Sequence, residues 1–362
     1  MQEVDQISFP PEVLSRIAPD LSLERHLKLG LRPCLRSFSE FKPIAVSSPA
    51  LEDEPNLVGS SIVSHGQTKV ICGISIGVVE AKNQSDTLNQ NETNSQDSKS
   101  DGEYDAEPVY PVVDIARGRT GAPTEEEMIL SQRLYEWVLQ SKIIPASALL
   151  TNPGVAIANQ TSSSQGSSAD VTILYPEDSD MPDLFSRVKP YKFVLYVHLK
   201  VFGRSGPLFD PCHAALIGAL KNTRLPRIYV PDSSIYSIKI PIRSRGNFGH
   251  RVKETRIFID ENQDLSNPLQ LNKDNIGGAS NYGLYDLSPG STSMDVDPNV
   301  IILADLEGDA EEAECMSKLN LIYNPNKKSI NNISYSGGGM VLTKDTLKQC
   351  FKLAKKRAEN TQ

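Results

Sequence analysis

The sequence predicts an α+β fold in which β-rich runs are followed by helical patterns in each half of the chain. Three observations carry this prediction. Two β-rich runs separated by a glycine turn lie at 59–77, and a long β-rich run extends from Phe193 to Phe202. Apolar residues recur at helical spacing over about 124–142. The length of 362 residues suits about two domains.

The first elements have recognisable boundaries. HGQ at 65–67 interrupts the β-rich runs of 59–77, and its glycine supplies the turn of a predicted hairpin. The helix at about 124–142 begins with Thr124 and Glu127 in the arrangement of a capping box. Its apolar stripe consists of Leu130, Leu134, Trp137 and Val138. Because the tryptophan lies on this stripe, we expect it in the core and not as a platform for a stacked base.

The run that ends at Phe202 leads into a second helix, which extends to about Asn222. Asp210 is the expected N-cap of this helix, because a proline follows it at the first helical position. His198 in the strand and His213 in the helix have no Ser or Cys partner in a recognisable nucleophile motif. We therefore interpret both histidines as structural.

The second half repeats the pattern of strands followed by a helix. SIKIPIRSR at 237–245 and VKETRIFID at 252–260 flank a glycine-containing turn, which predicts a hairpin with a basic, aromatic tip. VIILADL at 300–306 is expected to form a buried strand, and KLNLIYN at 318–324 alternates like a half-buried one. Three glycines then break the chain, and Thr343 is expected to cap the last helix.

Composition excludes several classes of protein. No apolar run approaches the ~18 residues of a membrane span, and the N-terminus lacks the pattern of a signal peptide, so we expect no membrane association. The five cysteines are scattered and form no CxxC pair. Neither a disulfide framework nor a metal site is therefore expected, and the thiols are predicted to be buried. No cofactor motif stands out.

The net charge of −8 is concentrated in one segment. Residues 81–107 hold seven acidic residues and two lysines, whereas the rest of the chain is close to neutral. This segment has almost no apolar residues, so it cannot offset the entropy of ordering by burial, and we expect a disordered acidic insert. A shorter polar stretch at 159–170 is expected to be a second loop of this kind.

The stretch VFGRSGPLFD at 201–210 raises the question of anion binding. Two glycines bracket Arg204 and Ser205 between a strand and a helix, where free N–H groups and the helix dipole can hold phosphate. The spacing matches neither GxxxxGK[ST] nor GxGxxG. A tight turn with a surface arginine is the alternative interpretation.

Five stretches together resemble the RNase PH family, and within it the ring subunits of the eukaryotic RNA exosome. They are LERHLKLGLRPCLRSFSEF, GSSIVSHGQTKVICGISIG, YPVVDIARGRTGAPTEEEMILSQRL, GRSGPLFDPCHAALIGALKNTRLP and VIILADLEGDAEEAE. The resemblance spans about 23–358. It implies two related β/α halves that share a core, at 23–225 and 226–362, and an N-terminal extension at 1–22 that packs on a neighbouring subunit.

The resemblance also implies an assembly and a role. The expected partners are RNase PH-like paralogues in a hetero-hexameric ring, RNA-binding cap subunits, a hydrolytic exoribonuclease and RNA. The expected role is 3′-end processing and degradation of RNA in the nucleus, nucleolus and cytoplasm.

Active members of the family bind phosphate with an arginine and hydroxyl side chains at the turn before the second helix. Here the arginine position falls on Ser205 and the last hydroxyl position on Leu208, while Arg204 is one residue out of place and Pro207 removes a backbone donor. The family's aspartate pair corresponds to Asp305 and a glutamate six residues on, which we interpret as a solvated acidic loop after a strand.

These departures predict a catalytically inactive subunit. The alternative is an active phosphate-dependent 3′-to-5′ exoribonuclease. A third possibility, an unrelated metabolic enzyme, has no cofactor motif in its favour.

Candidate RNA contacts are arginines at glycine-containing turns, which can reach phosphates through forked hydrogen bonds. They are Arg117, Arg119, Arg243, Arg245 and Arg251. Surface charges or salt bridges between subunits are an equally open interpretation. The basic run at 344–357 is expected to be the solvated face of the terminal helix.

Deleting residues 82–106 is expected to leave folding and assembly intact, because this segment has little apolar surface to bury. The measurement compares the melting temperature and the assembly of the deletion variant with those of the full chain. A large drop in melting temperature, or loss of assembly, would contradict the prediction.

Overall fold

The structure is a computed structural model that describes residues 9–51, 54–81, 109–118, 121–158, 171–177, 185, 188–231, 256–260, 266–287, 300–338 and 342–360. The acidic insert and the stretch 159–170 lie outside the described residues, as does most of the hairpin predicted over 237–260. Within the described part, no helix combines the length and the apolar composition that crossing a membrane requires.

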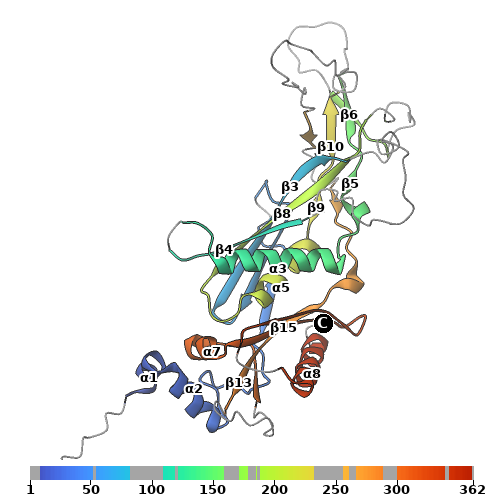
Figure 1. The fold of residues 1–362 in the computed structure, drawn as a ribbon. Coiled ribbons are helices and arrows are strands. Elements are labelled where there is room, and N and C mark those ends of the chain that lie inside the picture. The colour runs from blue at the N-terminus through green and yellow to red at the C-terminus, as the bar shows by residue number, and fades with distance from the viewer. Residues whose placement is uncertain are drawn as a thin grey trace, which may run out of the picture.

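The first half is built on a six-stranded sheet (Figure 1). Its strands, in spatial order, are β1 (Ile44–Ser47), β2 (Gly59–His65), β3 (Thr68–Glu80), β8 (Tyr191–Phe202) and β4 (Val109–Ile115), and β5 (Leu150–Thr151) also pairs with β8. Neighbours are antiparallel except β4 and β8, which are parallel. The predicted hairpin over 59–77 and the predicted strand ending at Phe202 are confirmed.

Two helices, α3 (Glu125–Ser141) and α5 (Phe209–Lys221), lie on the same side of this sheet (Figure 1). The capping box between Thr124 and Glu127 is present, and Trp137 is buried in the core between helices and sheet, as predicted. The N-cap prediction for α5 was wrong. The helix starts at Phe209, two residues before the predicted first position at Pro211, so Leu208 is the N-cap, without a side-chain hydrogen bond, and Asp210 lies inside the first turn.

The outer edge of β4 is blocked by α3. The Val113 N–H donates to Ser131 Oγ at 3.0 Å, and the Ile115 N–H donates to Glu127 Oε1 at 2.8 Å. Pro111, two residues before Val113, has no N–H to offer. Edge strands with free donors invite pairing with other chains, so these contacts protect the sheet from extension at this edge.

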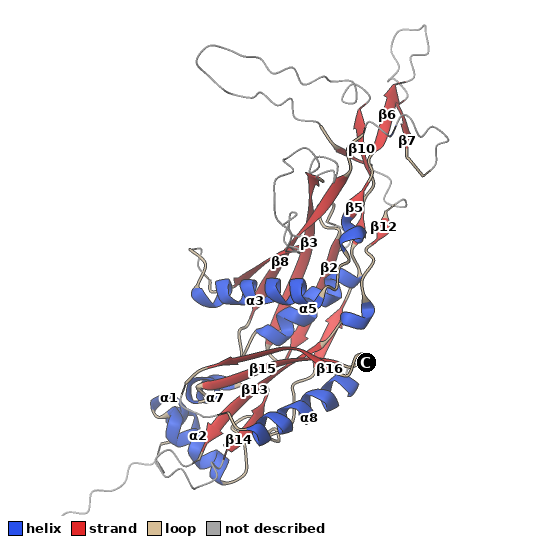
Figure 2. Ribbon diagram, turned by 45° about the vertical axis from the view of Figure 1, so that its right-hand side comes forward, coloured by secondary structure: helices blue, strands red, loops and turns tan. Residues whose placement is uncertain are grey.

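The second half contains a four-stranded antiparallel sheet covered by the terminal helix (Figure 2). The strands, in spatial order, are β14 (Val300–Ala304), β13 (Gly278–Asp286), β15 (Ser317–Asn324) and β16 (Ser329–Ser336). α7 (Gly308–Glu314) follows β14, and α8 (Lys344–Asn360) packs on β13 and β15. The predicted strands at 300–306 and 318–324 and the predicted last helix are confirmed.

Short elements complete the fold. β6 (Gly154–Ala158), β7 (Val171–Leu174), β10 (Ile228–Pro231) and β11 (Phe258–Ile259) form a small sheet that projects at one end of the molecule (Figures 1 and 2). β9 (Arg224–Leu225) pairs with β12 (Asn267–Pro268), and the 3₁₀ turns η2 (Ala146–Leu149) and η4 (Lys273–Asn275) lie in connections. With strands preceding helices in both halves, the predicted α+β class is confirmed.

The N-terminal helices α1 (Pro11–Ile17) and α2 (Pro19–Lys28) lie at the opposite end of the molecule, beside α7 (Figure 1). α2 inserts Leu23 and Leu27 into a small core with Leu303, Leu306 and Cys315. The N-terminal segment therefore packs on the second half of the chain, although most of the sequence lies between the two.

We expect Leu23→Ala to lower the free energy of unfolding by about 2–5 kcal/mol, because Leu23 is 0% exposed and its truncation leaves a cavity. Leu29→Ala is the matched control, since Leu29 is 75% exposed, and it should change stability by no more than about 0.5 kcal/mol. Urea unfolding of the full chain measures both. Equal effects of the two substitutions would show that α2 is not docked as described.

Candidate functional site

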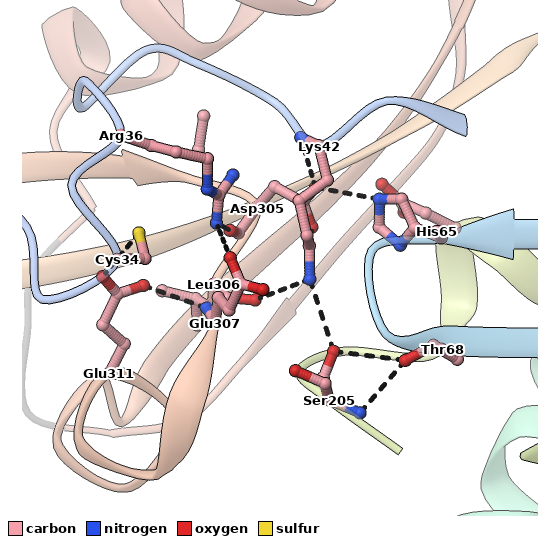
Figure 3. A network of polar contacts seen from close by, with 12 residues as sticks. Cys34, Arg36, Lys42, His65, Thr68, Ser205, Asp305, Leu306, Glu307 and Glu311 are labelled. Atoms are coloured by element: carbon pink, nitrogen blue, oxygen red, sulfur yellow. Dashed lines mark hydrogen bonds and ion pairs between the residues drawn. The ribbon is translucent and has the colours of Figure 1, made fainter. Parts of the chain in front are cut away.

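The turn at 203–206 lies where the β2–β3 hairpin meets the loop after β14 (Figure 3). Gly203 and Gly206 have positive φ angles of 63° and 82°. A Cβ atom at Gly206 would collide with the carbonyl oxygen of Leu306. Only glycine fits there, so the two halves of the fold touch backbone to backbone at this turn.

Hydrogen bonds within the protein already occupy the turn (Figure 3). The Ser205 N–H donates to Thr68 Oγ1 at 3.0 Å, and the Thr68 hydroxyl lies 3.1 Å from the Gly203 carbonyl oxygen. Lys42 Nζ donates to the carbonyl oxygens of Ser205 and Leu306, each at 3.3 Å. The turn thus presents carbonyl oxygens to a cation, which is the reverse of what an anion site needs.

Arg204 bridges two glutamates from different helices. Its Nε lies 3.1 Å from an oxygen of Glu126 in α3, and its Nη2 lies 2.5 Å from an oxygen of Glu312 in α7. Both pairs are bidentate, and Arg204 is 39% exposed. Two carboxylates therefore neutralise the cation of the turn and leave no net positive charge to attract phosphate.

Asp305 is completely buried next to the turn (Figure 3). Its Oδ2 accepts hydrogen bonds from the Lys42 backbone N–H and from Nε2 of His65, each at 2.9 Å, and Lys42 Nζ lies 3.8 Å from Oδ1. Burial opposes ionisation of this carboxyl. The hydrogen bond and charge of His65, together with Lys42, outweigh that effect and lower the pKa of Asp305 to about 2.

Glu311 forms a bidentate ion pair with Arg32, and neither side chain has exposed surface. The two contacts measure 2.9 and 2.5 Å. Arg32 also donates to the carbonyl oxygens of Ala304 and Asp305, and Glu311 accepts the N–H of Glu307 at 2.9 Å. Each nitrogen of the guanidinium and each oxygen of the carboxylate thus has at least one hydrogen-bond partner, which a buried pair needs.

The prediction of a solvated acidic loop at Asp305 and Glu311 was wrong. Both carboxylates are buried because Arg32 and Lys42 of the N-terminal segment and His65 of the hairpin reach them with hydrogen-bond donors. Arg36 extends the network by donating to the Asp305 carbonyl oxygen at 2.8 Å and pairing with Glu307 at 2.9 Å. None of these residues was predicted from sequence to contact the carboxylates, because isolated basic residues have no local feature that marks them as buried.

The start of α5 carries apolar and internally paired side chains. Leu208, at the last hydroxyl position of the family pattern, is 2% exposed and packs in the main core. Asp210 is buried, and its Oδ2 accepts from Arg357 of α8 at 2.7 Å. Burial raises the pKa of Asp210, although Arg357 opposes the shift. This helix start therefore adds no hydroxyl group to the turn.

Of the five predicted RNA-binding arginines, the structure describes Arg117. Its Nη2 pairs with Glu127 at 2.8 Å, and Glu127 also accepts the N–H of Thr124 and of Ile115. Arg119, Arg243, Arg245 and Arg251 lie outside the described residues. The role of all five in RNA binding stays a prediction, and the observed contact of Arg117 is an internal salt bridge.

The remaining candidates lie where a structural role would put them. His213 is buried against Trp137, with ring centroids 4.1 Å apart, and burial lowers its pKa to about 3. Cys72, Cys212, Cys315 and Cys350 are buried, and Cys34 is partly buried beside Glu311. Among the described residues, no three His, Cys, Asp or Glu side chains are placed to hold a metal ion.

Asp305→Asn is expected to lower the free energy of unfolding by about 3–5 kcal/mol, because it leaves Lys42 and His65 buried beside a neutral group. The control is Asp345→Asn in an exposed pair with Lys348, expected to change stability by no more than about 0.5 kcal/mol. Chemical unfolding of both variants is the measurement. An Asp305→Asn variant as stable as the control would refute the structural role of this carboxylate.

The contribution of Asp305 to the free energy of unfolding decreases at low pH. The folded pKa of Asp305 lies below the ~3.9 of an unfolded aspartate, so its contribution to stability is complete above that pH. The contribution is lost as the pH falls from about 4 toward about 2.

Comparison with known proteins places the fold. Family models match the 3′ exoribonuclease (RNase PH) family, domain 1 over residues 40–226 and domain 2 over residues 297–357. The exosome complex component rrp43 of Schizosaccharomyces pombe is 23% identical over 223 residues, 62% of this chain and 64% of the relative. The match thus spans less than two thirds of that relative. The name of the relative agrees with a resemblance in sequence to fungal ribosomal RNA-processing protein 43. The stretches that carry this resemblance are SLERHLKLGLRPCLR, SNYGLYDLSPG and ILADLEGDAEE.

Two solved structures share the fold. The Archaeoglobus fulgidus exosome with RNA bound to the active site matches with a TM-score of 0.55 at 15% identity, covering 96% of this chain and 98% of that one. An archaeal exosome core matches with a TM-score of 0.51 at 14% identity, covering 98% of each chain. The predicted RNase PH-like fold is confirmed, and the chain belongs to the 3′ exoribonuclease family that RNase PH represents.

Proposed function

We propose that this chain is a non-catalytic structural subunit of an RNA exosome ring, which supports 3′-to-5′ RNA processing and degradation by channelling RNA to an associated exonuclease. Its family membership and its similarity to an exosome component of Schizosaccharomyces pombe support a place in such an assembly. The contacts of the turn at 203–206 support the absence of catalysis.

The observation that carries the proposal is the internal pairing of Arg204. Phosphorolysis requires a bound phosphate positioned to attack the RNA chain, and a positioned nucleophile supplies much of the rate. Here the cation of the turn is held by Glu126 and Glu312, and the Ser205 N–H is held by Thr68. A phosphate would have to displace two carboxylates to reach this arginine.

Asp305 does not compensate for the missing phosphate site. A general acid must carry a proton near neutral pH and must reach the reacting atoms. The pKa of Asp305 is about 2, so the carboxyl is ionised at neutral pH, and the side chain has no exposed surface. Its contacts with Lys42 and His65 instead support a structural role.

In the proposed assembly, the N-terminal segment contributes surface for a neighbouring subunit. Apolar side chains on and after α1 and α2 are exposed, including Ile17 at 63%, Leu29 at 75% and Leu35 at 82%. Exposed apolar side chains that recur within residues 9–35 support association of this segment with another protein. The partners we propose are RNase PH-like paralogues in a hetero-hexameric ring, RNA-binding cap subunits, a hydrolytic exoribonuclease and RNA, in the nucleus, nucleolus and cytoplasm.

The second candidate function is an active phosphate-dependent 3′-to-5′ exoribonuclease. The observation in its favour is the similarity in fold to an archaeal exosome that has RNA at its active site. This alternative requires the turn at 203–206 to bind phosphate despite its internal contacts, and it therefore makes a different prediction for an activity assay.

The purified full chain is expected to release no nucleoside diphosphates from a 3′-extended RNA, with or without inorganic phosphate, because Arg204 is engaged by two carboxylates. The assay separates the nucleotide products, with a known phosphorolytic enzyme as positive control. Phosphate-dependent release that Arg204→Ala abolishes, while Lys200→Ala leaves it intact, would establish the second candidate function instead.

A further inference from the structure

The strand β1 forms one edge of the six-stranded sheet, and no strand in the described part of the chain pairs with its outer side. Its sequence, IAVS, contains no charged residue and no proline, with which proteins commonly protect a sheet edge. Val46 in this strand is 47% exposed. The opposite edge at β4 is blocked by α3, whereas β1 keeps an edge that can pair with an added strand.

A cleft of about 700 Å³ lies beside β1, between the two halves of the fold. Its other walls come from α5, α8 and the segment that leads into β13. Ile44 and Val46 of β1 and Ser48 just beyond it line the cleft, so alternate residues of this stretch face it. Side chains of neighbouring strands alternate between the two faces of a sheet in the same way. A strand added to β1 would therefore direct every second side chain into the cleft.

The walls of the cleft are mainly aliphatic. The apolar lining includes Ile44, Val46, Ala214, Ile217, Ile276 and Ala279, and no Phe, Tyr or Trp is among the described residues that line it. Single-stranded nucleic acids bind through bases that stack on aromatic side chains. Aliphatic walls instead suit the aliphatic side chains of a protein segment. Neither the turn at 203–206 nor Asp305 lines the cleft, so it is distinct from the site described above.

Exposed lysines surround the cleft. Lys221 at the end of α5 and Lys273 of η4 line it, and Lys327 and Lys328 directly follow two lining residues in the turn between β15 and β16. None of the four has a carboxylate partner within the described part of the chain. Asp274 is the acidic residue beside Lys273 in η4, and its single charge leaves an excess of positive charge. This excess favours a partner rich in Asp and Glu.

The two lysines that line the cleft lie toward the C-terminal end of β1. A Cβ atom at Gly59 would meet Thr223, two residues after Lys221. Gly59 begins β2, which is antiparallel to β1, so this contact marks the C-terminal end of β1. The Leu269 N–H donates to the Thr223 carbonyl oxygen at 2.9 Å, so the segment that leads to Lys273 lies beside the end of α5. Acidic groups of a partner are therefore expected at this end of the cleft.

We propose that an extended, acidic segment of a partner protein binds here as an added strand beside β1. Its backbone pairs with the outer edge of β1, and alternate aliphatic side chains enter the cleft. An acidic cluster at one end of the segment meets Lys221 and Lys273. This proposal stands independently of the proposed function, because it requires neither RNA nor catalysis.

The test titrates labelled synthetic peptides into the purified full chain and follows fluorescence polarisation. The probe alternates valine and threonine and ends in a run of aspartates. It is made in two versions, with the aspartates at either terminus, because an added strand can run in either direction. At least one version is expected to bind saturably, and more weakly at high salt. Lysines in place of the aspartates should abolish its binding.

Two N-methylated forms of the peptide that binds test the strand pairing. Methylation of the valines or of the threonines removes the N–H donors along one edge of the peptide, because alternate residues of a strand donate on the same side. One form should bind like the parent peptide, and the other should bind about tenfold more weakly. Binding of both forms at the affinity of the parent would contradict strand addition.

Substitutions in the cleft have matched controls. Val46→Glu places a carboxylate among the aliphatic walls and should weaken binding about tenfold. Val112→Glu should leave affinity unchanged, since Val112 is 50% exposed in β4 and does not line the cleft. Lys221→Gln and Lys273→Gln should each weaken binding about two- to fivefold, whereas Lys69→Gln, at an exposed position of β3 outside the cleft, should have no effect. The melting temperature of each variant without peptide shows whether its fold is kept.

Absence of saturable binding by both versions of the peptide would overturn the proposal. So would binding that the Val46, Lys221 and Lys273 variants leave unchanged. Oligouridylate tests the other class of partner, and it is expected not to displace the peptide. Displacement by this RNA, with an RNA affinity that Val46→Glu also lowers, would assign the cleft to RNA and overturn the proposal.

Discussion

The ion pair between Arg32 and Glu311 is the contact on which the arrangement of the two halves depends. Its two residues are 279 positions apart, and both side chains are fully buried. Burying two charges costs more than their attraction returns unless hydrogen bonds satisfy the remaining donors and acceptors. Here the backbone of residues 304–307 supplies those bonds, so the loop after β14 can adopt only the conformation that the pair requires.

Asp305 extends the same network toward the first half of the fold. It has a positive φ of 56°, a conformation that is uncommon for a residue with a side chain, and contacts to Lys42 and His65 hold it there. The Lys42 side chain also binds the turn at 203–206, because Nζ donates a hydrogen bond to the carbonyl oxygen of Ser205. Asp305 thus joins elements from distant parts of the chain through Oδ2, while its Oδ1, which has no exposed surface, lies 3.8 Å from Lys42 Nζ.

Sequence reasoning succeeded where the determining residues are close in the chain. The capping box predicts α3 because Thr124 and Glu127 are three positions apart, and the hairpin over 59–77 follows from alternation and a glycine turn. Asp210 failed as an N-cap because Arg357, 147 positions away, draws it into a buried pair. The acidic loop was misjudged for the same reason, since the partners of Asp305 lie 240 and 263 residues from it and no local pattern marks them.

A double-mutant cycle on Arg32 and Glu311 tests the structural role of this network most directly. The free energy of unfolding is measured for the full chain, Arg32→Gln, Glu311→Gln and the double variant. We predict a loss of about 3–5 kcal/mol for each single substitution and a coupling energy of about 0.5–3 kcal/mol, because removing either partner leaves an uncompensated buried charge. Single substitutions that each cost less than about 0.5 kcal/mol and simply add would show that the pair does not hold the halves together.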